Sequence, residues 1–181
     1  MTLRWTAAVA VAALIALPFV PACQDKNVSD AASADTLGGV CDADAKPAAL
    51  DLKLRDMNGV EVDLAGFKGK PMLINFWATW CPPCLEEIPD LIALHEARKN
   101  KDFVVIGVAM DYQNPKQVIE FADSMFVTYP IVLGTPKSAA QVGPVRGLPM
   151  TYLYNPEGKL VAHNVGPLTR AQIESFIDKK K

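Results

Sequence analysis

The sequence predicts an α/β domain in which helices cover both faces of a mixed β-sheet. Three observations predict this class. Two nearly uninterrupted apolar runs, 72–77 and 103–109, are typical of strands buried on both faces at the centre of a parallel sheet. Stretches with apolar residues at helical spacing follow each run. Two short strand-like segments, 150–154 and 159–164, flank a turn sequence and indicate an antiparallel hairpin at one edge.

The other elements follow from local patterns. Leu50, Leu52 and Leu54 alternate with charged residues and predict a half-buried strand. Asn58-Gly59 is a strong hairpin-turn sequence, so a return strand is expected to begin with Val60 and Val62. The remaining elements are expected in the order helix 83–98, helix 115–125 with Asn114 as N-cap, strand 129–133, helical turns 138–142, and a last helix opened by the Thr169–Gln172 capping box.

Composition and charge exclude several classes of protein. The chain has 181 residues, of which half are apolar, so it is neither a disordered nor a polytopic membrane protein. Eighteen basic residues face 20 acidic ones, which gives a formal charge of −2 and no basic excess for a nucleic-acid partner. Four cysteines are too few for a disulfide-stapled scaffold of this length.

Residues 1–22 are expected to be an export signal or anchor. Arg4 precedes an apolar run, 7–17, that is shorter than the roughly 20 residues needed to span a bilayer. Cys23 directly follows Ala22, as in lipoprotein signals whose new N-terminal cysteine is acylated. Lipidation of Cys23, cleavage after Ala22 and retention as an uncleaved anchor all remain open. Each places the domain in the periplasm or at the outer face of the cytoplasmic membrane.

Residues 23–48 are expected to form a flexible tether to a folded domain at 49–181. The segment is rich in Ala, Asp, Ser and Gly and has almost no aliphatic periodicity. Such a segment buries too little apolar surface to offset the entropy lost on ordering. Cys41 lies within it and is interpreted as an exposed thiol or a partner for Cys23.

The motif Cys81-Pro82-Pro83-Cys84 allows four interpretations. Covalent haem attachment requires histidine at the next position, where the chain has Leu85. A structural zinc site needs four ligands, and the sequence has no second closely spaced cysteine pair. A structural disulfide across this spacing closes almost no loop and adds little stability. The motif therefore favours a redox dithiol.

The position of the motif supports this interpretation. Cys81 is expected at the start of a helix, where unpaired backbone N–H groups and the positive end of the helix dipole favour its thiolate. Pro82 and Pro83 are compatible with a first helical turn, because N–H groups there have no acceptor within the helix. Cys84 lies one turn further and is expected to face the interior. Cys81 would thus be the reachable nucleophile and Cys84 the thiol that resolves the mixed disulfide.

Several stretches resemble the TlpA/ResA-type thiol–disulfide oxidoreductases of bacterial envelopes, which belong to the thioredoxin superfamily. The matching stretches, within a resemblance that covers residues 50–181, are 75–84, 85–89, 147–151 and 155–159. The resemblance implies a thioredoxin-like fold with a β-hairpin before the core and an insertion at about 114–142. It also implies that disulfide exchange needs no cofactor and no metal.

The resemblance assigns further site residues. Typical cytoplasmic thioredoxins carry a buried aspartate where this chain has Asn75, so proton handling for Cys84 must come from elsewhere. Glu87 is the candidate, because it follows Cys84 by three residues on the same helix face; the alternative is an acid that merely favours the helix start.

The bond before Pro149 is expected to be cis, whereas Trp77 is expected in the core and His95 on the surface. The residues expected to contact a partner protein are Trp80, Pro82, Pro83, Leu148 and Pro149.

The resulting hypothesis is an envelope protein that reduces disulfides of partner proteins. The resemblance implies targets such as apocytochrome c or copper-assembly proteins, an electron donor of the DsbD or CcdA kind, and membrane attachment through an N-terminal anchor or lipid. A disulfide-forming oxidant and a Cu(I) carrier using the same thiols are the alternatives. A thiol peroxidase is disfavoured, because Cys81 lacks the Pro-x-x-x-Thr-x-x-Cys context of peroxiredoxins.

Overall fold

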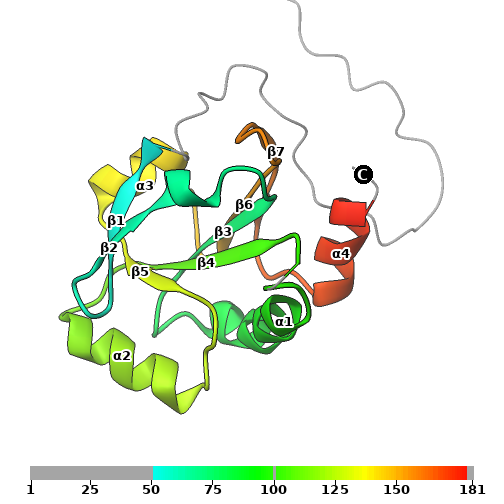
Figure 1. Cartoon of the computed structure of the whole chain (residues 1–181). Coiled ribbons are helices and arrows are strands. Elements are labelled where there is room, and N and C mark those ends of the chain that lie inside the picture. Colours follow the sequence, from blue (N-terminus) through cyan, green and yellow to red (C-terminus); the bar gives the residue numbers. More distant parts are fainter. Residues whose placement is uncertain (1–50, 100, 179–181) are drawn as a thin grey trace, which may run out of the picture. The chain divides into compact units, whose positions relative to one another are not determined.

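A computed structural model describes residues 51–99 and 101–178 (Figure 1). The predicted export signal at 1–22 and the whole predicted tether at 23–48, with Cys23 and Cys41, lie outside these residues. The elements, in chain order, are β1 (Lys53–Asp56), β2 (Glu61–Asp63), the 3₁₀ helix η2 (Leu64–Phe67), β3 (Met72–Trp77), α1 (Pro82–Arg98), β4 (Val104–Ala109), α2 (Pro115–Ser124), β5 (Ile131–Leu133), α3 (Pro136–Val142), β6 (Met150–Tyr154), β7 (Leu160–Val165) and α4 (Arg170–Asp178).

The strands form one seven-stranded mixed sheet in the order β2-β1-β5-β4-β3-β6-β7. Its centre is parallel, because β3 pairs with β4 and β4 pairs with β5 in the same direction. Both edges are antiparallel hairpins, β1 with β2 and β6 with β7. Every residue of β3 and β4 is buried, as the two apolar runs predicted. The predicted mixed sheet is confirmed.

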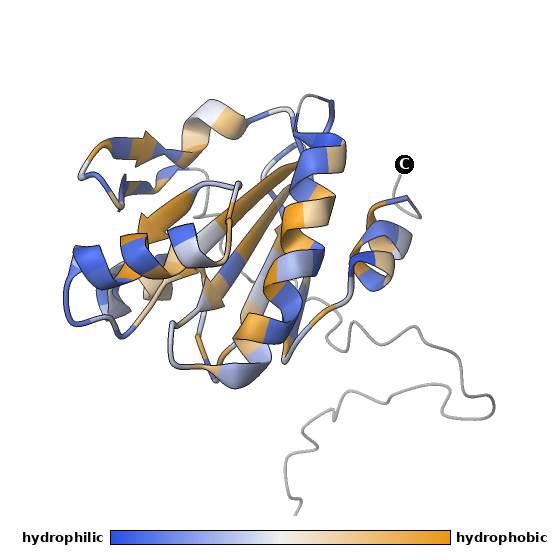
Figure 2. Ribbon diagram, turned by 90° about the horizontal axis from the view of Figure 1, so that it is seen from below, coloured by the Kyte–Doolittle hydropathy of each residue, from blue (hydrophilic) through white to orange (hydrophobic). Residues whose placement is uncertain are grey.

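Helices cover both faces of the sheet, as predicted. α1, α2 and α4 contribute to one apolar cluster, which contains Cys84, Val118 and Ile173. α3 and η2 contribute to a second cluster on the other face, which contains Leu64 and Ala139. Figure 2 shows the hydrophobic colouring concentrated on the central strands and on the inward sides of the helices. The region 114–142, predicted to contain the insertion, supplies α2, β5 and α3.

Val60 and the pair Tyr129–Pro130 fall outside the strands predicted for them, for local reasons. The side chain of Asp56 accepts the N–H groups of Asn58 and Val60, so Val60 belongs to the turn and its side chain is 61% exposed. β5 begins at Ile131 because Pro130 has no N–H to donate to a strand ladder. The predicted N-cap at Asn114 and the capping box at Thr169 are both present.

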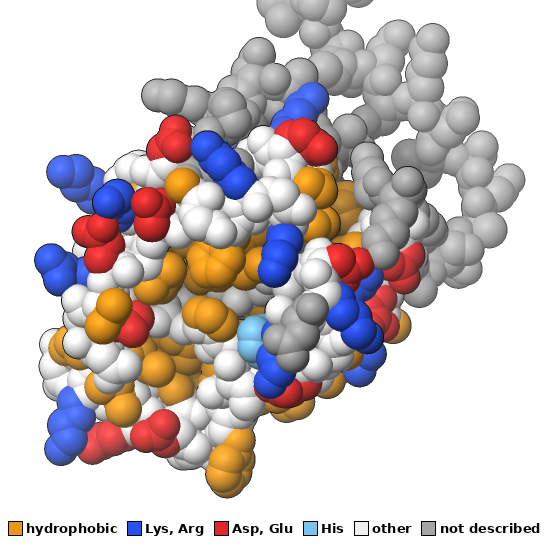
Figure 3. Space-filling view, viewed as in Figure 1, with side chains coloured by type: hydrophobic (Ala, Val, Ile, Leu, Met, Phe, Trp, Pro, Cys, Tyr) orange, Lys and Arg blue, Asp and Glu red, His pale blue; other side chains and the backbone are white. Residues whose placement is uncertain are grey.

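The surface shows no dominant charge on the face drawn in Figure 3, where acidic and basic side chains intermingle around hydrophobic atoms. Several charged side chains of the described residues are paired, for example Lys53 with Glu61 and Lys99 with Glu96. Within residues 51–99 and 101–178, no helix is both long and apolar enough to span a membrane.

Candidate functional site

Cys81 and Cys84 form a disulfide at the start of α1, with an S–S distance of 2.07 Å and a Cα–Cα distance of 5.3 Å. The chain leaves β3 at Trp77 and turns through a hydrogen bond from the Cys81 N–H to the Ala78 carbonyl, 3.2 Å. Cys81 is the N-cap residue of α1, and Pro82 is its first residue. The predicted pairing of the two cysteines at a helix start is confirmed, and the structure describes its oxidised form.

The disulfide is less accessible than the sequence led us to expect. Cys81 is 3% exposed and Cys84 is completely buried, so neither sulfur stands out from the surface in this form. The residues beside Cys81 are exposed, however, since Trp80 is 60% exposed and Pro82 is also exposed. The disulfide thus lies just beneath a rim of exposed side chains, and Cys81 is the less buried of the two cysteines.

The backbone donors at the start of α1 also differ from our expectation. Pro82 and Pro83 have no N–H, and the next two N–H groups, of Cys84 and Leu85, donate to the Cys81 carbonyl at 3.0 and 3.2 Å. The prediction that unpaired N–H groups surround the Cys81 sulfur is therefore wrong for the oxidised form. The helix dipole remains as a source of thiolate stabilisation.

Glu87 lies one turn after Cys84 and is 2% exposed. Its Oε1 accepts a hydrogen bond from Asn75 Nδ2 at 2.6 Å, and its Oε2 accepts one from the Leu168 N–H at 3.1 Å. Burial raises the pKa of Glu87 to about 7, although these two hydrogen bonds act in the opposite direction. Glu87 is therefore no exposed acid at a helix start, and its carboxyl group can change protonation near neutral pH.

Thr151 and Leu168 complete the surroundings of Glu87, and sequence reasoning did not identify either. Asn75 Nδ2 also donates to Thr151 Oγ1 at 3.1 Å, across the β3–β6 pair. A signal for Thr151 existed, since it is the one residue without a large apolar body in the buried strand Met150–Tyr154. Leu168 contributes a backbone N–H, which no sequence pattern reveals.

The peptide bond between Leu148 and Pro149 is cis, as the resemblance implied. This bond directly precedes β6, and the first residue of β6, Met150, pairs with Phe76 near the end of β3. The cis bond and Cys81 therefore lie at the same end of the sheet. The Pro149 carbonyl accepts the Gly166 N–H at 2.8 Å, which ties this loop to the end of β7.

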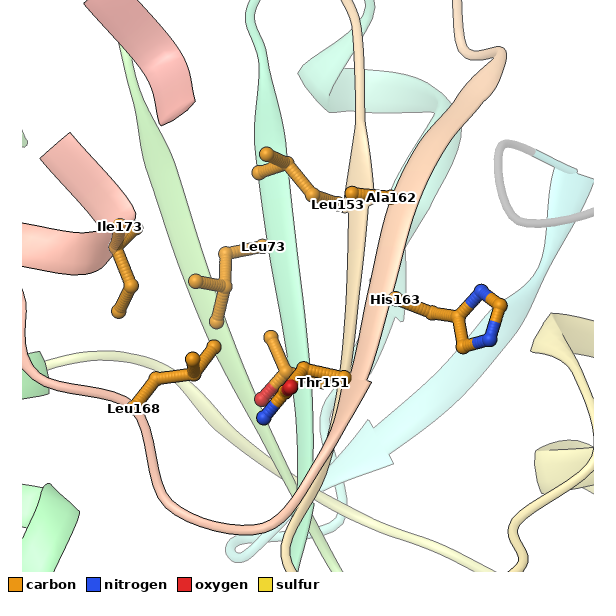
Figure 4. A pocket seen from close by; sticks show the side chains of 8 residues that line it. Leu73, Thr151, Leu153, Ala162, His163, Leu168 and Ile173 are labelled. Carbon is orange, nitrogen blue, oxygen red and sulfur yellow. The ribbon is translucent and has the colours of Figure 1, made fainter. Parts of the chain in front are cut away.

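A small pocket lies between the sheet and α4, and Thr151 and Leu168 of the Glu87 network line it (Figure 4). The side chains of Leu73, Leu168 and Ile173 gather on one side of the sheet, whereas His163 points to the other side. Thr151 lines the same pocket, which places the hydroxyl that binds Asn75 beside it. The lining residues are Leu73, Thr151, Leu153, Ala162, His163, Asn164, Leu168 and Ile173.

The structure also tests where the sequence placed Trp77 and His95. Trp77 is 1% exposed, which confirms the prediction that it is a core residue. His95, predicted to be a surface residue, is only partly exposed, because its ring packs against Tyr129 with centroids 6.3 Å apart and its Nδ1 is buried. Among the described residues, no group of three or more His, Cys, Asp or Glu side chains could hold a metal ion.

Comparisons with known proteins agree with this geometry. The Redoxin family matches residues 42–177. The chain is 34% identical over 125 residues to the thiol-disulfide oxidoreductase ResA of Bacillus subtilis (strain 168), covering 69% of each chain. It is also 34% identical over 129 residues to the thioredoxin-like protein YneN of the same organism, covering 71% of this chain and 75% of that protein.

A solved structure of a thioredoxin-family protein also matches this chain. The crystal structure of a thiol:disulfide interchange protein of the thioredoxin family from Chlorobium tepidum TLS superposes with a TM-score of 0.67 at 28% identity. The match covers 76% of this chain and 98% of that one. With its Cys81–Cys84 disulfide at the start of α1, this chain belongs to the Redoxin family and is a ResA-like thiol–disulfide oxidoreductase of thioredoxin fold.

Proposed function

We propose that this enzyme works as a reductant, transferring two electrons from the Cys81–Cys84 dithiol to disulfides of partner proteins. The observation that carries the proposal is the pair of cysteines at the start of α1 with the buried carboxyl of Glu87 one turn behind. This arrangement supplies an attacking sulfur, a resolving sulfur and a group for proton transfer.

The proposed reaction has two steps. The Cys81 thiolate attacks one sulfur of the partner disulfide, whose S–S bond breaks and releases one partner thiolate. The Cys84 sulfur then attacks Cys81 in the mixed disulfide and releases the second partner thiolate. The partner gains two electrons and two protons as its sulfurs become thiols, and the enzyme is left with the Cys81–Cys84 disulfide.

Glu87 is proposed to take the proton of the Cys84 thiol in the second step. Cys84 is completely buried, so its proton has no direct route to solvent. Asn75 cannot accept it, because an amide does not exchange protons at neutral pH. The pKa of Glu87, raised by burial to about 7, suits a group that must both take up and release a proton near neutral pH.

Two features of α1 support the reducing direction. A strong oxidant of this kind has a stabilised reduced form, with a thiolate of low pKa. Here Pro82 and Pro83 remove two backbone donors, and the next two N–H groups bind the Cys81 carbonyl. A buried carboxylate nearby also disfavours a second negative charge. Both features work against a strongly stabilised thiolate and hence against a strongly oxidising pair.

The partner is proposed to bind over the exposed Trp80 and Pro82 and the partly exposed Pro83 and Leu148, next to Pro149, which is itself buried. The backbone of residue 148 is proposed to pair with an extended segment of the partner. We propose envelope proteins with oxidised cysteine pairs as partners, such as apocytochrome c or copper-assembly proteins, and a membrane thiol transporter of the DsbD or CcdA kind as electron donor. Attachment to the outer face of the cytoplasmic membrane would come through residues 1–22 or through a lipid on Cys23.

The reduction potential of the Cys81–Cys84 pair tests the direction. We expect the full chain, equilibrated with glutathione buffers and analysed by thiol trapping, to have a potential near that of thioredoxin, about −270 mV. A value near about −120 mV, typical of a strong oxidant, would show that the enzyme forms disulfides instead.

A further inference from the structure

Some buried polar side-chain atoms have no hydrogen-bond partner within the protein. Within the part of the chain that the structure describes, the buried side-chain atoms that lack a hydrogen-bond partner are Asn75 Oδ1, Trp77 Nε1, His95 Nδ1 and Tyr129 Oη. Buried polar groups in proteins nearly always have a partner, either another protein group or an ordered water. A cluster of such atoms therefore indicates a place where water binds.

Three of these residues lie together on one face of the sheet. Asn75 and Trp77 are two residues apart on β3, so their side chains point to the same side. Asn75 is paired across the sheet with Gly107 on β4. A Cβ atom at Gly107 would lie 2.9 Å from Tyr129 Cε2 and 3.0 Å from Trp77 Nε1. The indole nitrogen of Trp77 and the ring of Tyr129 therefore both lie next to Gly107, which has no side chain to separate them.

The same cluster adjoins Glu87. Asn75 donates to the Glu87 carboxyl at 2.6 Å through Nδ2, so its unpartnered Oδ1 is close to that carboxyl. Burial raises the pKa of Tyr129, and the charge of Glu87 raises it further. Tyr129 is 3% exposed and keeps its phenolic proton, so it is available as a hydrogen-bond donor on the side of Glu87.

We propose that Asn75 Oδ1, Trp77 Nε1 and Tyr129 Oη bind a buried water that connects Tyr129 to Glu87, so that Tyr129 is a positioning residue for proton exchange at Glu87. The three atoms comprise an acceptor, a donor and a hydroxyl that can be either. A buried water makes about two to four hydrogen bonds, and these three atoms together with the Glu87 carboxylate provide four. The inference rests on the proposed role of Glu87 as the group that takes the proton of Cys84.

The water has a defined electrostatic effect on Glu87. The groups that face this carboxyl are Asn75 from β3, the Leu168 N–H from the segment before α4, Cys84 from its own helix and Tyr129 from the segment before β5. No basic side chain contributes to its pKa. A water held by Tyr129 donates a hydrogen bond to the carboxylate and favours its charged form, as such bonds generally do.

Tyr129→Phe tests the proposal, because it removes only the hydroxyl. We expect the titration of the Glu87 carboxyl carbon, followed by NMR in the oxidised full chain and assigned with Glu87→Gln, to shift upward by about one pH unit. The matched control is Tyr154→Phe, a buried tyrosine of the opposite face whose hydroxyl binds the Val142 carbonyl. It should leave the Glu87 titration unchanged. An unshifted or lowered midpoint in Tyr129→Phe would overturn the proposal.

A second measurement on the unmodified chain detects the water itself. We expect the indole N–H of Trp77, assigned with Trp77→Phe, to show a magnetisation-transfer signal to a bound water, and this signal to be lost in Tyr129→Phe. A Trp77 signal without any water contact would overturn the proposal even if the variants failed to fold. Both measurements are independent of partner reduction, so full activity of Glu87→Gln would overturn the proposed proton role and leave the water site standing.

Discussion

Replacing Cys81 with serine is expected to abolish catalysis, so that partner disulfides are reduced only at the uncatalysed rate, because the variant has lost the attacking sulfur. Replacing Cys84 with serine should block the reaction at a later point. Cys81 still attacks the partner, but no second sulfur resolves the mixed disulfide, and the covalent complex accumulates. The complex is measured on non-reducing gels and its partner is identified by mass spectrometry after reduction.

The comparison of these two variants separates the roles of the cysteines. Cys41→Ser is the matched control, because it makes the same chemical change in the predicted tether, and it should retain full activity. We expect Cys84→Ser to trap envelope proteins that carry closely spaced cysteine pairs, and Cys81→Ser to trap none. Equal trapping by both variants would contradict the assignment of Cys81 as the nucleophile.

The second large effect is expected from Glu87→Gln on the pH dependence of stability. The pKa of Glu87 rises from about 4.5, its ordinary value, to about 7 in the folded state. The folded state therefore binds more protons than the unfolded chain between these values, and this carboxyl lowers stability as the pH rises through them. At about 1.4 kcal/mol for each pKa unit, the free energy of unfolding falls by about 3 kcal/mol once the pH is above 7.

Glutamine cannot titrate, so Glu87→Gln should lose this pH dependence. We expect its free energy of unfolding, measured with denaturant, to rise relative to that of the unmodified chain by about 3 kcal/mol between pH 4.5 and pH 8. Glu86→Gln is the control, because Glu86 is exposed on the same helix. Parallel stability curves for Glu87→Gln and the unmodified chain would show that the folded environment does not raise the pKa of Glu87.

The order of the elements could be predicted because each strand and helix carries its own local pattern. The runs 72–77 and 103–109 are typical of central strands, and Asn114 and Thr169 mark helix starts through side-chain caps. Val60 was assigned wrongly because its apolar side chain suggested a strand. The carboxylate of Asp56 instead holds its N–H in the turn.

The site could be predicted only where neighbouring residues define it. Cys81 and Cys84 are three residues apart, and the spacing alone brings them together at a helix start. The groups that hold Glu87 are distant in sequence, since Leu168 lies 81 residues away and Thr151 binds Asn75 from 76 residues away. Such contacts depend on how the sheet and α4 pack. The same packing places Cys81 deeper than its position at a helix start suggested.

The measurement that most directly tests the central claim is the rate at which each thiol of the reduced full chain reacts with iodoacetamide. Tandem mass spectrometry distinguishes Cys81 from Cys84 within one peptide, and the rate is followed as a function of pH. We expect Cys81 to be modified first and Cys84 to remain protected, because Cys84 is completely buried behind it. Faster modification of Cys84, or no modification of either thiol, would contradict a reactive Cys81 at the start of α1.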